Sequence, residues 1–161
     1  MKKTRKPAAY RQYTFMDALL ASPTNPMPVE KQIFQLDQMR SGLDAMERSE
    51  NPQPNDWRCV SDAINLLETM VKMGLIDDSE GLLNDAVTAM GEAGARAMAG
   101  QTLRLSGQGI QACRAVLDDY AMAMSQLSER TMIQAYMRTE RRIQDILKGK
   151  CQAHDVRVIS V

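Results

Sequence analysis

The chain is poor in the residues that most often perform chemistry or crosslink a fold. Its only histidine is His154, so any histidine-based dyad depends on one residue near the end of the sequence. Its three cysteines, Cys59, Cys113 and Cys151, follow no disulfide-framework spacing. Cys151 and His154 have a C-x-x-H spacing, but a structural zinc site needs about four ligands. We therefore expect no metal, no cofactor and a reducing, cytoplasmic setting.

Aromatic residues and long apolar runs are also scarce. Aromatics make up 4% of the chain, and no apolar run approaches the roughly 18 residues of a membrane span. The basic start lacks the apolar stretch of a secretory signal, so we expect neither export nor a membrane partner. The 161 residues are instead 44% apolar, with 13 Met among them. Unbranched apolar side chains favour helices, so this composition predicts one all-α domain.

The spacing of apolar residues predicts a helical bundle of four to five helices. A basic arm, a short helix at residues 14–21 and a proline-rich linker are expected over residues 1–27. The bundle is expected over residues 28–148 and a C-terminal tail over residues 149–161. Small residues crowd residues 86–100, which predicts that another helix approaches closely there. The first three apolar stripes are Ile33, Leu36, Met39, Leu43 and Met46; Trp57, Val60, Ile64, Leu67 and Val71; and Leu83, Ala86, Val87, Met90, Ala93 and Ala97.

The last apolar stripe is the longest and contains a slip. It follows Ile110, Cys113, Leu117, Tyr120, Met124 and Leu127, and then Met132, Tyr136, Thr139, Ile143 and Leu147. The slip at residues 128–131 indicates either a stutter in one helix or a bend between two. Unbroken, residues 108–147 would span about 60 Å. We expect a long C-terminal helix, which makes a homo-oligomer joined through this helix one hypothesis.

Short signals predict the ends of the helix that contains the second stripe. Asn55 or Asp56 is expected to be its N-cap, because both side chains can accept a hydrogen bond from a free backbone N–H. Gly74 is expected just past its last turn, where glycine adopts the left-handed conformation without strain.

Charges are segregated along the chain, although the formal net charge is zero. Residues 1–13 carry five bases and no acid, and residues 14–129 carry 17 acids against eight bases. Residues 130–161 carry seven bases against three acids. Such a chain attracts partners region by region rather than through its net charge.

Three groups of residues are candidates for contacting a partner. They are the basic arm (Lys2, Lys3, Arg5, Lys6, Tyr10, Arg11 and Tyr13), the basic patch (Arg138, Arg141 and Arg142) and the acidic pair (Asp118 and Asp119). Cations of the arm and patch can neutralise phosphates, and the rings can stack on bases. The acidic pair could cover a basic surface of a partner. The plainer alternatives are an arm that is solvated or lies on the acidic middle, and a patch that stabilises a helix C-terminus.

No set of residues predicts an enzyme. Residues 106–112, SGQGIQA, match the dinucleotide pattern G-x-G-x-x-A, but that site needs a preceding strand and a parallel sheet. The flanking segments are helical, so we interpret this stretch as the start of a helix. No nucleophile, base and orienting group come together elsewhere, and we expect no enzymatic activity.

The order of segments carries one resemblance. A KKxRKP start, a proline-interrupted linker, DW followed by VSDAINLLETM, and a final QAYMRTERRIQDIL resemble small uncharacterised all-helical accessory proteins of bacteriophages, prophages and plasmids of Gram-negative bacteria. The resemblance brings no catalytic residues. It implies a mobile-element protein that binds a host or defence component, as anti-CRISPR proteins do.

These observations give one leading hypothesis and two alternatives. The leading hypothesis is a non-enzymatic protein that binds a macromolecular partner, foremost a host or defence protein, as an inhibitor or adaptor. The first alternative is a nucleic-acid-binding module that uses the basic arm and the basic patch. The second is a homo-oligomeric structural protein.

Overall fold

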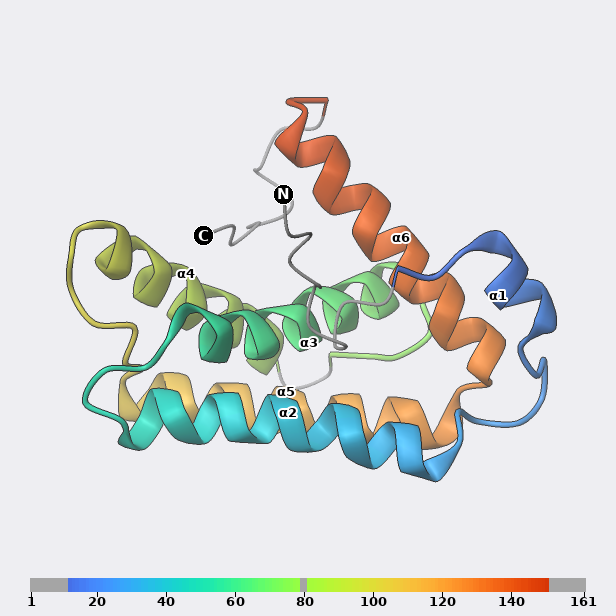
Figure 1. Ribbon diagram of the computed structural model, residues 1–161, viewed down its shortest axis with the longest axis horizontal. Helices are drawn as coiled ribbons and strands as arrows, with labels where there is room; N and C mark the ends of the chain where they lie inside the picture. The colour runs from blue at the N-terminus through green and yellow to red at the C-terminus, as the bar shows by residue number, and fades with distance from the viewer. Residues whose placement is uncertain (1–11, 79–80, 151–161) are drawn as a thin grey trace, which may run out of the picture.

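The structure is a computed structural model that describes residues 12–78 and 81–150 (Figure 1). The chain is all-α in these ranges, as predicted, and it contains no strand there. Six helices lie in the described residues. They are α1 (Phe15–Leu20), α2 (Val29–Arg48), α3 (Pro54–Lys72), α4 (Leu82–Met98), α5 (Gly107–Gln126) and α6 (Glu129–Leu147).

Helix α3 is the centre of the fold. It contacts α2, α4, α5 and α6, while α1 packs on α6 at one end of the molecule (Figure 1). Its predicted stripe is confirmed, since Trp57, Val60 and Ile64 are all 2% exposed or less. The indole Nε1 of Trp57 donates to the carbonyl of Met90 at 3.0 Å, which satisfies its buried N–H and joins α3 to α4.

The predicted stripe of α2 is buried only in part. Met39, Leu43 and Met46 lie in the core, and Leu36 packs against it. Ile33, by contrast, is 53% exposed, so its expected burial is wrong. The apolar stripe of α2 therefore joins the core only after the first turns of the helix.

The expected long C-terminal helix is wrong, because the chain bends between α5 and α6. Leu127 has extended backbone angles (φ −81°, ψ 146°), and the Ser128 side chain caps α6. Backbone carbonyls within residues 22–25 accept hydrogen bonds from the N–H groups of Glu129 (2.8 Å) and Arg130 (3.0 Å). The first turn of α6 is thus satisfied by the linker rather than by a preceding helical turn. The slip in the apolar stripe marks a bend between two helices.

Two glycines allow helices to approach closely. A Cβ at Gly42 of α2 would lie 2.7 Å from the backbone oxygen of Asp56 in α3. A Cβ at Gly109 of α5 would lie 2.8 Å from the Cβ of Ala89 in α4, within the segment rich in small residues. The close approach of another helix to this segment, predicted from its composition, is confirmed.

Parts of the expected tails lie outside the described residues. These are residues 1–11 of the basic arm and residues 151–161 of the C-terminal tail. Within the described ranges, none of the helices is both long enough and apolar enough to cross a membrane.

Candidate functional site

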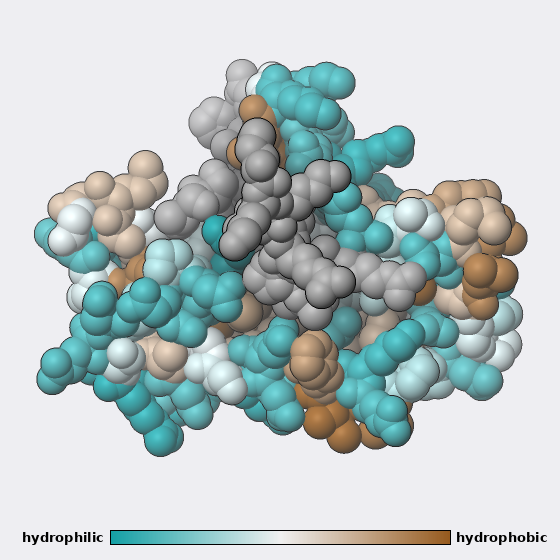
Figure 2. Space-filling view, in the orientation of Figure 1, coloured by the Kyte–Doolittle hydropathy of each residue, from teal (hydrophilic) through white to brown (hydrophobic). Residues whose placement is uncertain are grey.

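Helix α1 exposes more apolar surface than it buries. Only Ala18 among its residues is buried, together with Ala21 just after the helix. The large side chains form the apolar face of α1: Phe15 (70% exposed), Met16 (59%), Leu19 (52%) and Leu20 (82%). Hydrophobic residues gather over α1 at the right of the molecule in Figure 2. Contiguous exposed apolar side chains of this kind mark interaction surfaces.

A single arginine of α6 fastens α1 to the body of the protein. The Arg130 guanidinium donates to the backbone carbonyls of Ala18, Leu19 and Ala21, each at 3.1 Å. A capping box closes the opposite end of α1. A six-residue helix is too short to hold itself together in water, so these contacts keep α1 folded. The apolar face is therefore presented on a fixed support.

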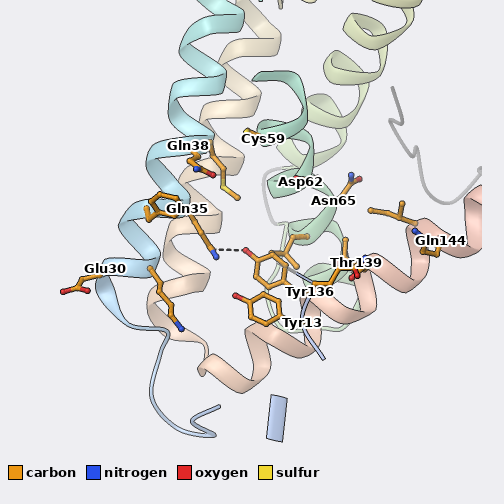
Figure 3. Close-up of a pocket in the computed structure, with 17 residues that line it drawn as sticks. Tyr13, Glu30, Gln35, Gln38, Cys59, Asp62, Asn65, Tyr136, Thr139 and Gln144 are labelled. Carbon is orange, nitrogen blue, oxygen red and sulfur yellow. Dashed lines mark hydrogen bonds between the residues drawn. The ribbon is translucent and has the colours of Figure 1, made fainter. Parts of the chain in front are cut away.

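A groove of about 600 Å³ lies beside this region, lined by α2, α3, α6 and the residues before α1 (Figure 3). Its apolar lining includes Phe34, Met39, Leu66 and Ile143. Phe34 is 52% exposed, so its ring is available to a ligand. The volume is in the range of sites that hold a small molecule or a few residues of a peptide.

Tyrosine hydroxyls form a hydrogen-bonded cluster at the groove. The Tyr136 hydroxyl donates to the side-chain oxygen of Gln35 at 2.9 Å. The Tyr120 hydroxyl hydrogen-bonds to the Tyr136 hydroxyl and lies 3.3 Å from the same Gln35 oxygen. The ring of Tyr13 packs on Tyr136 with 5.3 Å between centroids (Figure 3). Burial raises the pKa of both Tyr120 and Tyr136, so their hydroxyls stay protonated at neutral pH. The cluster therefore fixes Gln35 in one orientation.

Carboxylates lie close to the Cys59 thiol in the groove. Burial raises the pKa of the Cys59 thiol, and the nearby carboxylates of Asp62 and Asp56 raise it further. Cys59 is thus a protonated thiol at neutral pH rather than an activated nucleophile. Glu140 accepts a hydrogen bond from Nε2 of Gln12 at 2.6 Å, a neutral donor that leaves the carboxylate charge in place.

The groove is equipped for binding through hydrogen bonds, charge and apolar contact. The polar groups of its described lining residues are amides, carboxylates, hydroxyls, the Cys59 thiol and the Lys31 ammonium group. In the part of the chain that the structure describes, no group of three or more His, Cys, Asp or Glu is arranged to hold a metal ion.

The structure divides the predicted basic patch. Arg138 and Arg141 are exposed on α6. The side chain of Arg142 is only 15% exposed, because it donates to the Glu68 carboxylate at 2.8 Å and to the Asn65 carbonyl at 3.3 Å. Arg142 therefore joins α6 to α3 and does not share a surface with the other two arginines.

The other predicted contact residues lie apart from one another. Asp118 is exposed on α5, with its carboxylate 3.8 Å from the guanidinium of Arg40, and Asp119 is half-buried. Tyr13 is half-buried at the groove. The remaining residues of the basic arm lie outside the described residues: Lys2, Lys3, Arg5, Lys6, Tyr10 and Arg11.

Sequence reasoning missed both the apolar face of α1 and the groove. The apolar face had a local signal, because five of the six residues in FMDALL are apolar and a helix with one buried side needs fewer. The groove had none, since its lining comes from four separate segments that range from Gln12 to Gln144.

Comparisons of the chain with protein-family models, curated proteins and solved structures find no match. The resemblance to accessory proteins of mobile elements therefore stays a prediction.

Proposed function

We propose that this chain is a non-enzymatic binding protein that docks a partner protein on the apolar face of α1. The proposal rests on the exposure of four large apolar side chains, since Phe15, Met16, Leu19 and Leu20 are all more than half exposed. The helix that presents them is held in place by three hydrogen bonds from the Arg130 guanidinium. Covering such side chains is favourable by about 25 cal/mol for each Å² removed from water. Because the support is already ordered, little entropy is lost when the partner docks.

The class of partner in this proposal is a host or defence protein, met in the cytoplasm. On this proposal the chain is a mobile-element accessory protein that acts as an inhibitor or adaptor. The resemblance supports this part, and the segregated charges agree with a partner that is recognised region by region.

The test compares substitutions on the apolar face of α1 with a substitution at a similarly exposed apolar residue elsewhere. We would capture partners from host lysate with tagged full-length protein, with and without nuclease, and then measure affinity for the purified partner. Phe15→Ser with Leu20→Ser should weaken binding by about tenfold or more, since central apolar contacts dominate interface energies. Met98→Ser is the control, because Met98 is 78% exposed and ends α4, which lies at the opposite end of the molecule from α1 (Figure 1). Equal binding by both variants would contradict the proposal.

Nucleic-acid binding is the second candidate, favoured by the exposure of Arg138 and Arg141 on α6. Each phosphate contact contributes about one unit to the slope of log affinity against log salt. Replacing both arginines with Ala should therefore lower this slope by about two in a filter-binding titration with double-stranded DNA. A slope unchanged by the substitutions would remove the patch from this role.

A homo-oligomer joined through one long helix gains no support from the described residues. The helix bends at Leu127, and the first part of its stripe is buried in the protein's own core. The buried positions are Ile110, Cys113, Leu117, Tyr120 and Met124.

A further inference from the structure

The described part of the chain begins in the wall of the groove. Gln12 and Tyr13, its first two residues, both belong to the lining. Nε2 of Gln12 donates to the Glu140 carboxylate at 2.6 Å, and the ring of Tyr13 packs on Tyr136 (Figure 3). Residues 1–11 are therefore joined to the fold at a point that is fixed in the groove.

The groove is short enough to be filled by a few extended residues. Its lining on α2 runs from Glu30 to Met39, a rise of about 14 Å along a helix. An extended chain advances about 3.3 Å per residue, so four or five residues cover this length. Residues 7–11, directly before Gln12, are sufficient. Residues 145–150, at the other end of the described chain, contribute nothing to the lining, so the segment before Gln12 is the better placed of the two.

The sequence of this segment suits an extended conformation and a mixed lining. Residues 6–11 read KPAAYR. Pro7 restricts its own backbone and disfavours a helical conformation at Lys6. Tyr10 offers an apolar ring with a polar tip, which matches a lining of apolar side chains, amides and hydroxyls.

The walls of the groove can pair with the backbone of an extended segment. The side-chain amides of Gln38 on α2 and Gln144 on α6 belong to the lining. Primary amides both donate and accept, so they match the N–H and C=O groups of a peptide backbone. A segment lying between these two helices would therefore find partners for backbone groups that lose water there.

The charges of the segment and of these walls are also compatible. Residues 1–11 carry five bases and no acid. Among the described lining residues, Glu30 is exposed, and Glu140 accepts its hydrogen bond from a neutral amide. The lining also contains Lys31, but its Nζ lies 3.6 Å from Glu129. The carboxylates of Glu30 and Glu140 are thus placed to attract a basic segment.

We propose that residues 6–11 of the chain's own basic arm occupy the groove, and that any external ligand of the groove must displace them. The Tyr10 ring packs on the apolar lining around Phe34 and Ile143, and the cations of the segment are attracted to the two carboxylates. This contact is independent of the docking proposed for the apolar face of α1.

The attachment at Gln12 makes the contact intramolecular. A short tether gives a segment an effective concentration in the millimolar range. A segment with a Kd of about 0.1 mM when free would then fill the groove in about nine molecules of ten. An external ligand would bind about tenfold more weakly, because only the empty fraction can accept it. The arm would thus act as an autoinhibitory contact that keeps weak ligands out of the groove.

The test separates the segment from its tether. Amide NMR spectra of the wild type are compared with those of a full-length arm variant, Lys6→Ser with Tyr10→Ser and Arg11→Ser. The arm variant should show shifted amides at the positions of α2 and α6 that line the groove. Adding a synthetic peptide of residues 2–11 should return these amides toward their wild-type positions. The wild type should bind the same peptide about tenfold more weakly than the arm variant does.

Two further changes, each made in the arm variant, locate the peptide. Phe34→Ser with Glu140→Gln should weaken peptide binding by about tenfold or more. Phe34 is 52% exposed and the amide oxygen at position 140 can still accept from Gln12, so the fold should persist. The matched control, Met98→Ser with Glu92→Gln, makes the same kinds of change at exposed positions of α4 and should leave binding unchanged.

Four results would overturn the proposal. They are coincident groove amides in the wild type and the arm variant, equal peptide affinity for both, equal loss in the α4 control, and no binding to the arm variant up to about 5 mM peptide, a concentration at or above that of the tethered segment. Protein concentration tests a second copy as the source of the segment. Groove shifts in the wild type that grow with concentration, together with a dimeric mass by light scattering, would assign the groove to the arm of another copy and overturn the intramolecular contact.

Discussion

At the scale of single residues, Gly42 and Gly91 are two helical glycines at which the same substitution should have opposite effects. Both lie inside helices, but only Gly42 has a neighbouring backbone within 4 Å of where a Cβ would stand. Gly42→Ala should lower the free energy of unfolding by about 1–3 kcal/mol, because the backbone oxygen of Asp56 cannot move as a side chain can. Gly91→Ala should raise it by up to about 1 kcal/mol through helix propensity. Urea denaturation at pH 7 measures both, and effects of the same sign would contradict the close approach of α2 and α3.

Buried acidic hydroxyls and thiols predict a loss of stability in alkali. Burial raises the pKa of Cys113 to about 12, and burial also raises the pKa of Tyr120 and Tyr136 above the ordinary value of 10.0. The folded state holds these protons longer than the unfolded state. Stability is therefore unaffected below about pH 9 and falls as pH rises further. Urea midpoints at pH 7.5, 9.5 and 10.5 measure this fall.

The control for the alkaline loss is Tyr120→Phe with Tyr136→Phe. This variant lowers stability at every pH, because Gln35 loses the hydroxyl that donates to it and the hydrogen bond between the two hydroxyls is lost, but its alkaline decline should be shallower. A wild-type midpoint that stays constant to pH 10.5 would contradict the assigned pKa directions.

Residue-level prediction from sequence works where a signal is local and complete. Gly74 ends α3 in the left-handed conformation (φ +69°), as predicted. The expected N-cap at Asn55 or Asp56 is wrong, because Pro54 starts the helix and Gln53 is the N-cap. Asp56 contributes differently, since its carboxylate accepts from the backbone N–H of Gln53 at 2.8 Å. A proline in the first turn shifted the start of the helix toward the N-terminus.

At the scale of helices, α1 depends on one side chain of α6. Arg130→Ala removes three charge-assisted hydrogen bonds and should release α1, because the helix is too short to persist alone. We expect loss of hydrogen-exchange protection at residues 17–21 and a global destabilisation of about 1–3 kcal/mol. Arg138→Ala is the control, since Arg138 is exposed on the same helix. Protection that survives in Arg130→Ala would show that the capping box and the packing of Ala18 and Ala21 hold α1 without the guanidinium.

The bend between α5 and α6 shows what apolar periodicity can predict and what it cannot. The slip at residues 128–131 is visible in the sequence, but two helix geometries fit it. The choice is made by Ser128 and by carbonyls within residues 22–25, more than 100 positions away in the chain. A pattern of local spacing cannot contain that information.

At the scale of the whole molecule, one core joins α2, α3, α4, α5 and α6. Trp57 is 2% exposed within it, so its fluorescence reports on the packing of α3 against α4. We expect urea unfolding to give the same midpoint by Trp57 fluorescence and by far-UV circular dichroism, as a single cooperative domain does. An earlier loss of helical signal would mean that part of the bundle unfolds independently.

The candidate sites were less predictable than the fold because they depend on which helices become neighbours. Helical class and most core stripes follow from composition and spacing. Burial of Arg142 against Glu68, by contrast, depends on the packing of α6 on α3, and the groove on the packing of three helices. Charge and ring content in the sequence indicated contact residues, but only tertiary packing decides which remain accessible.

The way in which Arg130 binds α1 affects which substitutions the apolar face of α1 tolerates. The guanidinium holds backbone carbonyls of α1, which every amino acid supplies, and makes no use of the exposed side chains. Phe15, Met16, Leu19 and Leu20 can therefore be exchanged for other helix-forming residues while the helix stays in place. Point mutations can therefore change the partner specificity of this apolar face while α1 keeps its fold and its position on α6.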